Sequence, residues 1–299
     1  MTPPPALLAY QAGALLARAL PEPVAQLSGR TVGFWLTIGM AGRRQVVERH
    51  LQRLHGRRMG VLELRREVHR TFDSYARYWL ESFRLTGMGP ADLDAGIVAE
   101  GIDHLDDGLA AGKGVIMALP HLGGWDFGGA WLATQGYPIT VVVEPLEPPE
   151  LFEWFVEFRR RLGLDVIPLG PDAGRKVLRA LRRNEVVGLL CDRDIDGNGV
   201  EVDFFGERTT LPAGPVTLAL RTGAALLPTA VYFEGDGHRG VIHPPLPLER
   251  TGSLRADVAA GTQTLADALQ AMIARAPEQW HVLQPNWPSD HLGGAVPSR

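Results

Sequence analysis

The sequence predicts an α/β fold in which a mainly parallel central sheet is flanked by helices. From residue 100 onward, short apolar runs alternate with amphipathic helical segments, a pattern typical of parallel sheets covered on both faces. Hydrophobic residues make up 45% of the 299-residue chain and charged residues 21%, so the chain can bury a full core. We expect a helical N-terminal region over residues 1–90 and an α/β core over residues 91–299.

The N-terminal region combines a predicted amphipathic helix with a local excess of positive charge. A helix over residues 6–20 places its apolar side chains on one face, namely Leu8, Ala12, Leu15, Leu16 and Leu20. Phe34-Trp35 and an arginine-rich stretch over residues 43–58 follow, and residues 1–80 contain twelve Arg but only five acidic residues. This combination predicts contact with an anionic membrane surface; the alternative is a helical cap with a solvated basic face.

The chain carries no signal for a membrane span, a disulfide or a metal site. The candidate span over residues 31–42, between Arg30 and Arg43, has 12 uncharged residues, fewer than the roughly 20 that a spanning helix needs. Residues 1–17 lack the basic segment of a signal peptide. Cys191 is the single cysteine, which predicts a reducing compartment and an inert buried thiol. We therefore expect a protein in the cytosol or on the cytosolic membrane face, without metal or nucleic acid.

Three predicted strands end in ionisable side chains. A helix over residues 61–83, with an apolar stripe of core aromatics, precedes the predicted strands and helices. The strands are expected at 115–119, 139–143, 166–167, 186–191, 226–233 and 241–242, and the helices at 151–162, 175–183 and 265–274. His121, Glu144 and Asp192 follow the ends of three of these strands. Because ligands of such sheets bind beyond the carboxyl ends of the strands, these residues predict a site there.

The loop that begins at His121 has the composition of an acid–base site. Asp126 follows after four residues, and the pair Gly123-Gly124 between them allows a tight turn. A carboxylate on one ring nitrogen would leave the other nitrogen free to take a proton from an alcohol, as in a serine hydrolase triad without the serine. The two glycine N–H groups would then hold an oxyanion. The alternative is a buried histidine bonded to a helix-capping aspartate.

His121-x4-Asp126 in this setting resembles the HX4D motif of the glycerol-phosphate-acyltransferase-like enzymes. More closely, nearly the whole chain resembles the lipid A late acyltransferases and their actinobacterial relatives, the phosphatidylinositol mannoside acyltransferases. The blocks that carry this resemblance are residues 75–79, 200–207, 223–229 and 280–285, with a looser match over residues 105–114. The last block, Trp-His-x-Leu-Gln-Pro, is the most specific to the mannoside group.

The resemblance implies a peripheral enzyme of the inner leaflet that needs no cofactor. It would move palmitate from acyl-CoA to the 6-hydroxyl of mannose on phosphatidylinositol mono- or dimannosides. His121 matches the general base and Asp126 its partner. Asp192 matches the second acidic residue beside the histidine, a position where the family usually has Glu, so the charge is kept but the reach is shorter by about one methylene.

The resemblance also implies two substrate-binding residues. Glu144 matches an acidic residue that contacts the mannosyl acceptor, and Arg159 matches an essential arginine near the substrate. A guanidinium suits the phosphates of CoA and of a phosphoinositide. The acyl chain needs an apolar groove, for which Trp125, Phe127 and Trp131 are candidates if they do not belong to the core.

Other functions remain open at this point. The acceptor could be lipid A or a lysophospholipid, and the donor an acyl carrier protein. A lipid-binding scaffold of the same fold without activity is the non-enzymatic alternative, although an intact pair of His121 and Asp126 disfavours it. A hydrolase is disfavoured because the sequence has no Gly-x-Ser-x-Gly elbow.

Overall fold

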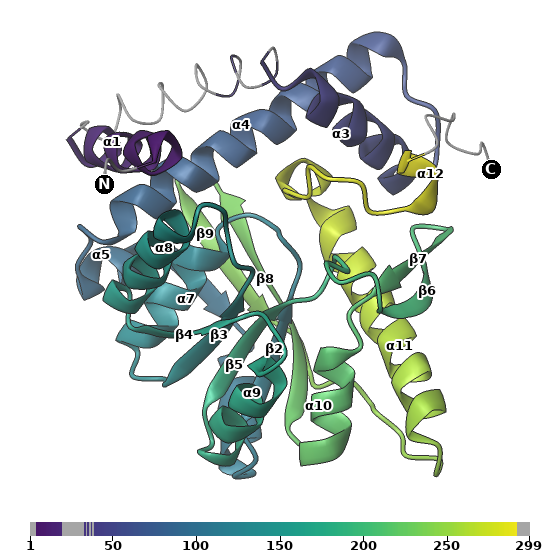
Figure 1. Cartoon of the computed structure of the whole chain (residues 1–299). Helices are drawn as coiled ribbons and strands as arrows, with labels where there is room; N and C mark the ends of the chain where they lie inside the picture. Colours follow the sequence, from purple (N-terminus) through teal and green to yellow (C-terminus); the bar gives the residue numbers. More distant parts are fainter. Residues whose placement is uncertain (1–3, 20–32, 34, 36, 38, 292–299) are drawn as a thin grey trace.

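A computed structural model describes residues 4–19, 33, 35, 37 and 39–291, and it confirms the α/β class (Figure 1). The central sheet has seven strands in the order β1-β9-β8-β2-β5-β3-β4, and only the β8–β9 pair is antiparallel. These strands are β1 (Ile97–Glu100), β2 (Val115–Leu119), β3 (Ile139–Val143), β4 (Leu164–Pro168), β5 (Val186–Leu190), β8 (Ala225–Glu234) and β9 (Gly237–Ile242). A separate antiparallel hairpin joins β6 (Val200–Phe204) and β7 (Glu207–Leu211).

Helices cover both faces of the sheet. They are α1 (Pro5–Ala19), α3 (Ala41–Leu54), α4 (Val61–Leu85), α5 (Pro90–Ala95), α6 (Ile102–Ala110), α7 (Trp125–Thr134), α8 (Pro149–Arg161), α9 (Ala173–Arg182), α10 (Gly214–Thr222), α11 (Leu254–Arg275), the 3-10 turn η1 (Pro277–Gln279) and α12 (Pro288–His291). Along β2, Val115 and Met117 join the core beneath α7 and α8, whereas Ile116 and Ala118 join the core beneath α9, α10 and α11. Burial on both faces explains the uninterrupted apolar run of this strand.

The order of the strands brings the predicted strand ends together. β5 lies between β2 and β3 and runs parallel to both, so the carboxyl ends of these three strands share one edge of the sheet. His121, Asp192 and Glu144 follow them in the chain. The sequence predicted the strand ends, and the topology makes them neighbours.

The structure corrects several predicted elements. The last long helix begins at Leu254 and not at the predicted residue 265. Gly261 interrupts its apolar pattern, because a Cβ there would lie 2.7 Å from a Val216 methyl group. The strand β1 and the β6–β7 hairpin were not predicted. In β1 and β6 less exposed and exposed side chains alternate over only four or five residues, which is too short for the periodicity to be recognised.

The N-terminal helices α1, α3 and α4 lie along one end of the molecule (Figure 1). Tyr10 of α1 packs edge-on against Trp79 of α4 and Phe155 of α8, so this helix is docked on the core. Phe72 is buried as predicted, whereas Val61 at the start of α4 is exposed. The predicted positions Leu20 and Phe34 lie outside the described residues, and the division at residue 90 stays a prediction. Within the described part of the chain, no helix is long and apolar enough to cross a membrane.

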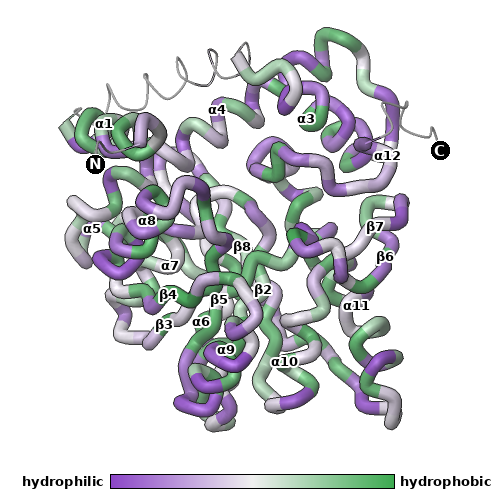
Figure 2. The backbone as a smooth tube through the Cα atoms, in the orientation of Figure 1, coloured by the Kyte–Doolittle hydropathy of each residue, from purple (hydrophilic) through white to green (hydrophobic). Residues whose placement is uncertain are grey.

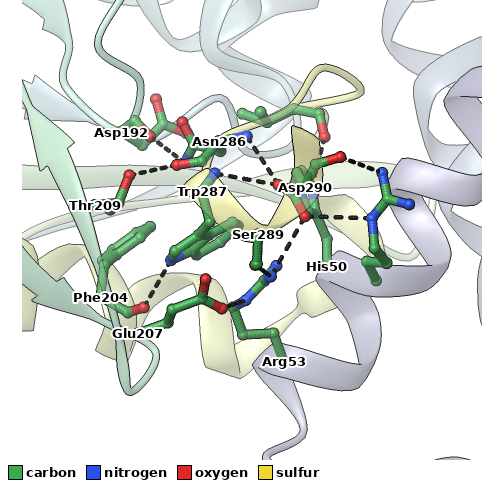
Figure 3. A network of polar contacts seen from close by, with 12 residues as sticks. His50, Arg53, Asp192, Phe204, Glu207, Thr209, Asn286, Trp287, Ser289 and Asp290 are labelled. Atoms are coloured by element: carbon green, nitrogen blue, oxygen red, sulfur yellow. Dashed lines mark hydrogen bonds and ion pairs between the residues drawn. The ribbon is translucent and has the colours of Figure 1, made fainter. Parts of the chain in front are cut away.

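A buried ion cluster fastens the C-terminal segment, residues 280–291, to α3 (Figure 3). The Asp290 carboxylate is fully buried and contacts the His50 ring at 3.0 Å and the Arg53 guanidinium at 3.3 Å. It also accepts hydrogen bonds from the main-chain N–H groups of Asn286 and Trp287, at 3.0 and 3.1 Å. Burial raises the pKa of the Asp290 carboxyl, but the bond to His50 and the other partners outweigh burial and hold it below its ordinary value.

Replacing Asp290 by Ala is expected to lower the free energy of unfolding by about 3–5 kcal/mol, because buried Arg53 keeps only Glu207 as a carboxylate partner among the described residues, and the buried His50 ring loses its partner. Urea denaturation followed by tryptophan fluorescence measures the change. Glu201→Ala is the control, since the ion pair of Glu201 with Arg208 is exposed and its loss should barely move the midpoint. Equal effects of the two substitutions would show that the cluster does not anchor the segment.

Candidate active site

The loop after β2 is held in a tight conformation by its neighbours. Gly123 has a φ of +59°, and a Cβ there would lie 2.1 Å from the Val231 carbonyl oxygen, so only glycine fits. On the other side, the His281 N–H donates to the His121 carbonyl oxygen at 2.7 Å, and Leu122 forms a short antiparallel bridge with Trp280. The backbone that carries His121 is therefore fixed by β8 and by the C-terminal segment.

The His121 ring is paired with Asp192. Its Nδ1 lies 2.7 Å from Asp192 Oδ1, and the His121 main-chain N–H donates to Oδ2 at 2.8 Å. An ionised carboxylate only accepts, so Nδ1 carries the proton and Nε2 presents its lone pair. Among the described residues Nε2 has no hydrogen-bond partner, and the ring lines a large cavity. This geometry is that of a general base whose tautomer is set by a carboxylate.

Asp192 is fully buried and remains a carboxylate because donors surround it. Trp280 Nε1–H donates to its Oδ2 at 2.7 Å, and the Asn286 side chain donates to its main-chain oxygen at 3.0 Å. Burial alone raises the pKa of this carboxyl, but the charge and the hydrogen bonds of His121, followed by the bond from Trp280, hold the pKa below its ordinary value.

The predicted pairing of Asp126 with the His121 ring is not the one that the structure forms. Asp126 lies in the first turn of α7 and is 5% exposed. Its carboxylate contacts Arg159 of α8 through two nitrogens, each at 3.2 Å, and accepts a hydrogen bond from the Tyr78 hydroxyl of α4 at 2.7 Å. Burial and then the Asp126 charge raise the pKa of Tyr78, which keeps it a donor. The two charged residues of the motif therefore have separate partners.

The predicted oxyanion role of the glycine N–H groups is also corrected. Gly123 N–H donates to the Gln279 carbonyl oxygen at 3.0 Å, and Gly124 N–H donates to the Val231 carbonyl oxygen at 2.9 Å. Both donors are occupied, so neither is available to an oxyanion in this conformation. The glycines allow the loop to approach β8 closely.

Glu144 is joined to an arginine that sequence analysis did not single out. Arg193, which directly follows Asp192, donates to the Glu144 carboxylate at 2.6 Å. Both side chains line the same cavity as His121. Arg159 also lines this cavity, with its guanidinium engaged by Asp126. The structure thus brings four of the predicted site residues, His121, Asp126, Glu144 and Arg159, to the wall of one cavity. Asp192 is buried behind that wall and contacts the His121 ring.

The cavity has a volume of about 570 Å³, which lies in the range of small-molecule sites. Its walls are mostly apolar, with side chains such as Met117, Leu119 and Val141 from the central strands. Of the three aromatic residues predicted for the acyl groove, Trp125 and Trp131 line the cavity. Phe127 does not line it and stacks on His238, with 3.9 Å between the ring centroids. Such a cavity suits a long apolar substrate with a polar end at the histidine.

Two further titratable groups near the pair are buried and neutral. Burial, followed by the charge of His121, lowers the pKa of His281 to about 3. Its Nε2 contacts the Ser74 hydroxyl at 2.9 Å, while its buried Nδ1 lacks a partner among the described residues. Cys191 is fully buried, and burial raises the pKa of its thiol far above the ordinary value, which supports an inert thiol. Among the described residues, no group of His, Cys, Asp or Glu side chains is arranged to hold a metal ion.

Sequence analysis missed two residues that donate hydrogen bonds to Asp192 and Asp126, because these donors are far away along the chain. Tyr78 and Trp280 belong to blocks noted for their resemblance, but no local pattern assigned them a role. Trp280 is 88 positions from Asp192 in the chain, and Tyr78 is 48 positions from Asp126. For Arg193 the sequence did offer a signal, because this residue directly follows Asp192 at the end of a predicted strand.

An α/β fold with a carboxylate-bound histidine on the wall of an apolar cavity defines an enzyme that handles acyl chains. The sequence matches the bacterial lipid A biosynthesis acyltransferase family over residues 6–289. The chain belongs to this family and is an O-acyltransferase.

Relatives within the family are similar over most of their length. A phosphatidylinositol mannoside acyltransferase of Mycolicibacterium smegmatis is 42% identical over 289 residues, which cover 95% of this chain and 91% of the relative. One of Mycobacterium tuberculosis is 46% identical over 74% of this chain and 70% of the relative. A lipid A biosynthesis acyltransferase of Haemophilus influenzae is 27% identical over 60% of this chain and 55% of the relative.

The buried neutral His281 should make folding sensitive to acid. Its pKa is about 3 in the folded protein and near 6.5 when unfolded, so the unfolded chain takes up the proton first as the pH falls. The contribution of His281 is fully present above pH 6.5 and is lost between pH 6.5 and 3, by at most about 1.4 kcal/mol per pH unit. His281→Gln should flatten this part of the curve of unfolding free energy against pH, whereas His55→Gln, at an exposed site, should leave it unchanged.

Proposed function

We propose that this protein transfers a palmitoyl-type chain from acyl-CoA to the 6-hydroxyl of mannose on phosphatidylinositol mono- or dimannosides. The observation that carries the proposal is the His121–Asp192 pair, whose Nε2 lies on the wall of a large apolar cavity. The specific acceptor is supported by the 42–46% identity to relatives named phosphatidylinositol mannoside acyltransferases. The proposed reaction requires no cofactor, since acyl-CoA serves as co-substrate.

The mechanism is direct transfer. The acceptor hydroxyl gives its proton to His121 Nε2 as its oxygen attacks the thioester carbonyl carbon. Asp192 stabilises the imidazolium that forms, because its buried negative charge lies at Nδ1. When the tetrahedral intermediate collapses, the C–S bond breaks, the CoA thiolate takes the proton from Nε2, and the ester remains on the sugar.

The other site residues take supporting parts in this proposal. Asp126, with Tyr78 and Arg159, anchors the first turn of α7 and so the loop that carries His121. Glu144 faces the cavity and, once released from Arg193, accepts hydrogen bonds from sugar hydroxyls, while Arg193 then supplies positive charge for phosphate groups.

We also propose that α1 rests on the cytoplasmic face of the cell membrane. Leu7, Ala14 and Ala17 are buried against the core, whereas Leu8, Leu15 and Leu16 are between 48% and 65% exposed. Figure 2 shows hydrophobic residues along α1 at the same end of the molecule as α3. The arginines of α3 add positive charge for anionic headgroups.

The deciding experiment is an acceptor screen. Purified protein is incubated with palmitoyl-CoA and, separately, with a phosphatidylinositol dimannoside, a lipid A precursor and a lysophospholipid. Mass spectrometry of the products identifies the acylated lipid and the acylated position. Acylation of the mannose 6-hydroxyl supports the proposal, and preferred acylation of another lipid overturns it. A parallel arm with acyl carrier protein tests the donor.

Replacing His121 by Ala should abolish transfer, with a fall of at least about a hundredfold in kcat, because the substitution removes the Nε2 atom that takes the hydroxyl proton. The circular dichroism spectrum and the unfolding midpoint should stay close to those of the wild type, since the ring is only partly buried. His104→Ala, on α6 and outside the cavity wall, is the matched control and should keep full activity. Undiminished transfer by the His121 variant would refute the assignment.

Replacing both Leu15 and Leu16 by Ser should weaken binding to vesicles of phosphatidylinositol and phosphatidylcholine by at least about tenfold, since each exposed leucine that enters the bilayer contributes about 1–3 kcal/mol. Cosedimentation measures the loss. Val98→Ser, at an exposed apolar position on β1, is the control and should bind like the wild type. Unchanged binding of the double variant would show that another surface meets the lipid.

A further inference from the structure

Two segments that are far apart in the sequence hold Asp192 in place. The loop of His121 supplies two donors, one to each carboxylate oxygen. The C-terminal segment supplies the third donor to the carboxylate, Trp280 Nε1–H on Oδ2 at 2.7 Å. Its Asn286 side chain donates to the Asp192 main-chain oxygen at 3.0 Å and so holds the backbone of the same residue. Since Asp192 is 0% exposed, water does not replace a donor that is lost.

The donors of the C-terminal segment are themselves anchored (Figure 3). The Asn286 main-chain N–H donates to the buried Asp290, and Asp290 is bound by His50 and Arg53 of α3. Trp280 is 3% exposed and packs against the His50 ring with 5.2 Å between ring centroids. A continuous set of buried contacts therefore connects α3 with the residue that orients the base.

We propose that Trp280 and Asn286 are positioning residues, which fix Asp192 so that its carboxylate meets the Nδ1 of His121. The inference rests on the proposed function, in which His121 removes the proton of the acceptor. Neither residue lines the cavity, so both act through Asp192 and not on the substrate. A hydrogen bond from a neutral donor to a buried charge is strong enough to control both the position and the basicity of that charge.

The chain offers a matched pair of substitutions for the test. Trp280 and Trp287 are both buried, and each donates its indole N–H at 2.7 and 3.0 Å respectively, but the acceptor of Trp287 is the main-chain oxygen of Phe204. Trp280→Phe should lower kcat about ten- to hundredfold with little change in KM. Trp287→Phe loses an equivalent donor and should keep kcat within about twofold.

The pH dependence separates positioning from simple loss of packing. Removing the Trp280 donor raises the proton affinity of the His121–Asp192 pair, so the acid limb of the kcat/KM profile should move to higher pH. The nearby groups His281 and Cys191 stay neutral across this range, and four charged groups at the cavity wall lie in the Glu144–Arg193 and Asp126–Arg159 ion pairs. Trp287→Phe should leave the limb in place.

A second arm needs no substrate. In protein labelled with ¹⁵N-tryptophan, Asp192→Asn should shift the indole N–H signal of Trp280, assigned by its absence in Trp280→Phe, and leave that of Trp287 in place. Adding Trp280→Phe to Asp192→Asn should cost no further activity if Trp280 acts through Asp192. Asn286→Leu, which removes the amide donor to Asp192, should also lower kcat. This variant replaces Trp280→Phe in the test if Trp280→Phe does not fold.

The results distinguish this inference from the proposed function. If the wild type does not acylate mannolipids but the Trp280 signal responds to Asp192→Asn, the function is wrong and the positioning contact stands. Equal losses in the two Trp→Phe variants, an unmoved acid limb, or additive effects with Asp192→Asn would each overturn the positioning role.

Discussion

The contact between a buried carboxylate and an imidazole at the edge of the sheet is the interaction on which the site depends. Asp192 has no exposure to water, so its charge persists only because His121 and Trp280 donate hydrogen bonds to its carboxylate, while Asn286 holds its main-chain oxygen. Its ionised state then fixes the proton of the ring on Nδ1 and directs the Nε2 lone pair into the cavity. The C-terminal segment and α3 support this arrangement, because the Asp290 carboxylate of that segment is bound by His50 of α3 and by the main-chain N–H of Asn286.

The charged residues of the His-x4-Asp loop belong to two separate clusters. His121 faces Asp192 from β5, while Asp126 turns to Arg159 and Tyr78 on α8 and α4. Each cluster joins elements that are far apart in sequence, so the loop is held on both sides. Because Arg159 and Asp126 neutralise one another in a buried location, breaking either would leave an uncompensated charge. The motif therefore serves both the chemistry and the rigidity of the loop.

The cavity and the N-terminal helices around His121 and Asp192 are consistent with the family of the protein. Apolar side chains of the central strands form a cavity of about 570 Å³ that ends at polar residues, so an acyl chain and a polar acceptor can meet at the histidine. The N-terminal helices cover one end of the core, and α1 keeps three leucines exposed there. Membership of the lipid A biosynthesis acyltransferase family agrees with an enzyme that brings two lipid-like substrates together.

The sequence by itself determined the α/β class, most of the strands and the three strand ends at His121, Glu144 and Asp192, because apolar runs and the residues that follow them are local features. It predicted Asp126 as the carboxylate that orients the His121 ring, since Asp126 is close along the chain, whereas the ring contacts Asp192. It also predicted that the Gly123 and Gly124 N–H groups hold an oxyanion, but both donate to backbone carbonyl oxygens. Tertiary structure alone decided these points. The parallel pairing of β2 with β5 brings Asp192 beside the histidine, and the return of the chain after α11 brings Trp280 onto Asp192. Contacts between residues about 70 to 90 positions apart depend on how the sheet is ordered, which no local pattern encodes.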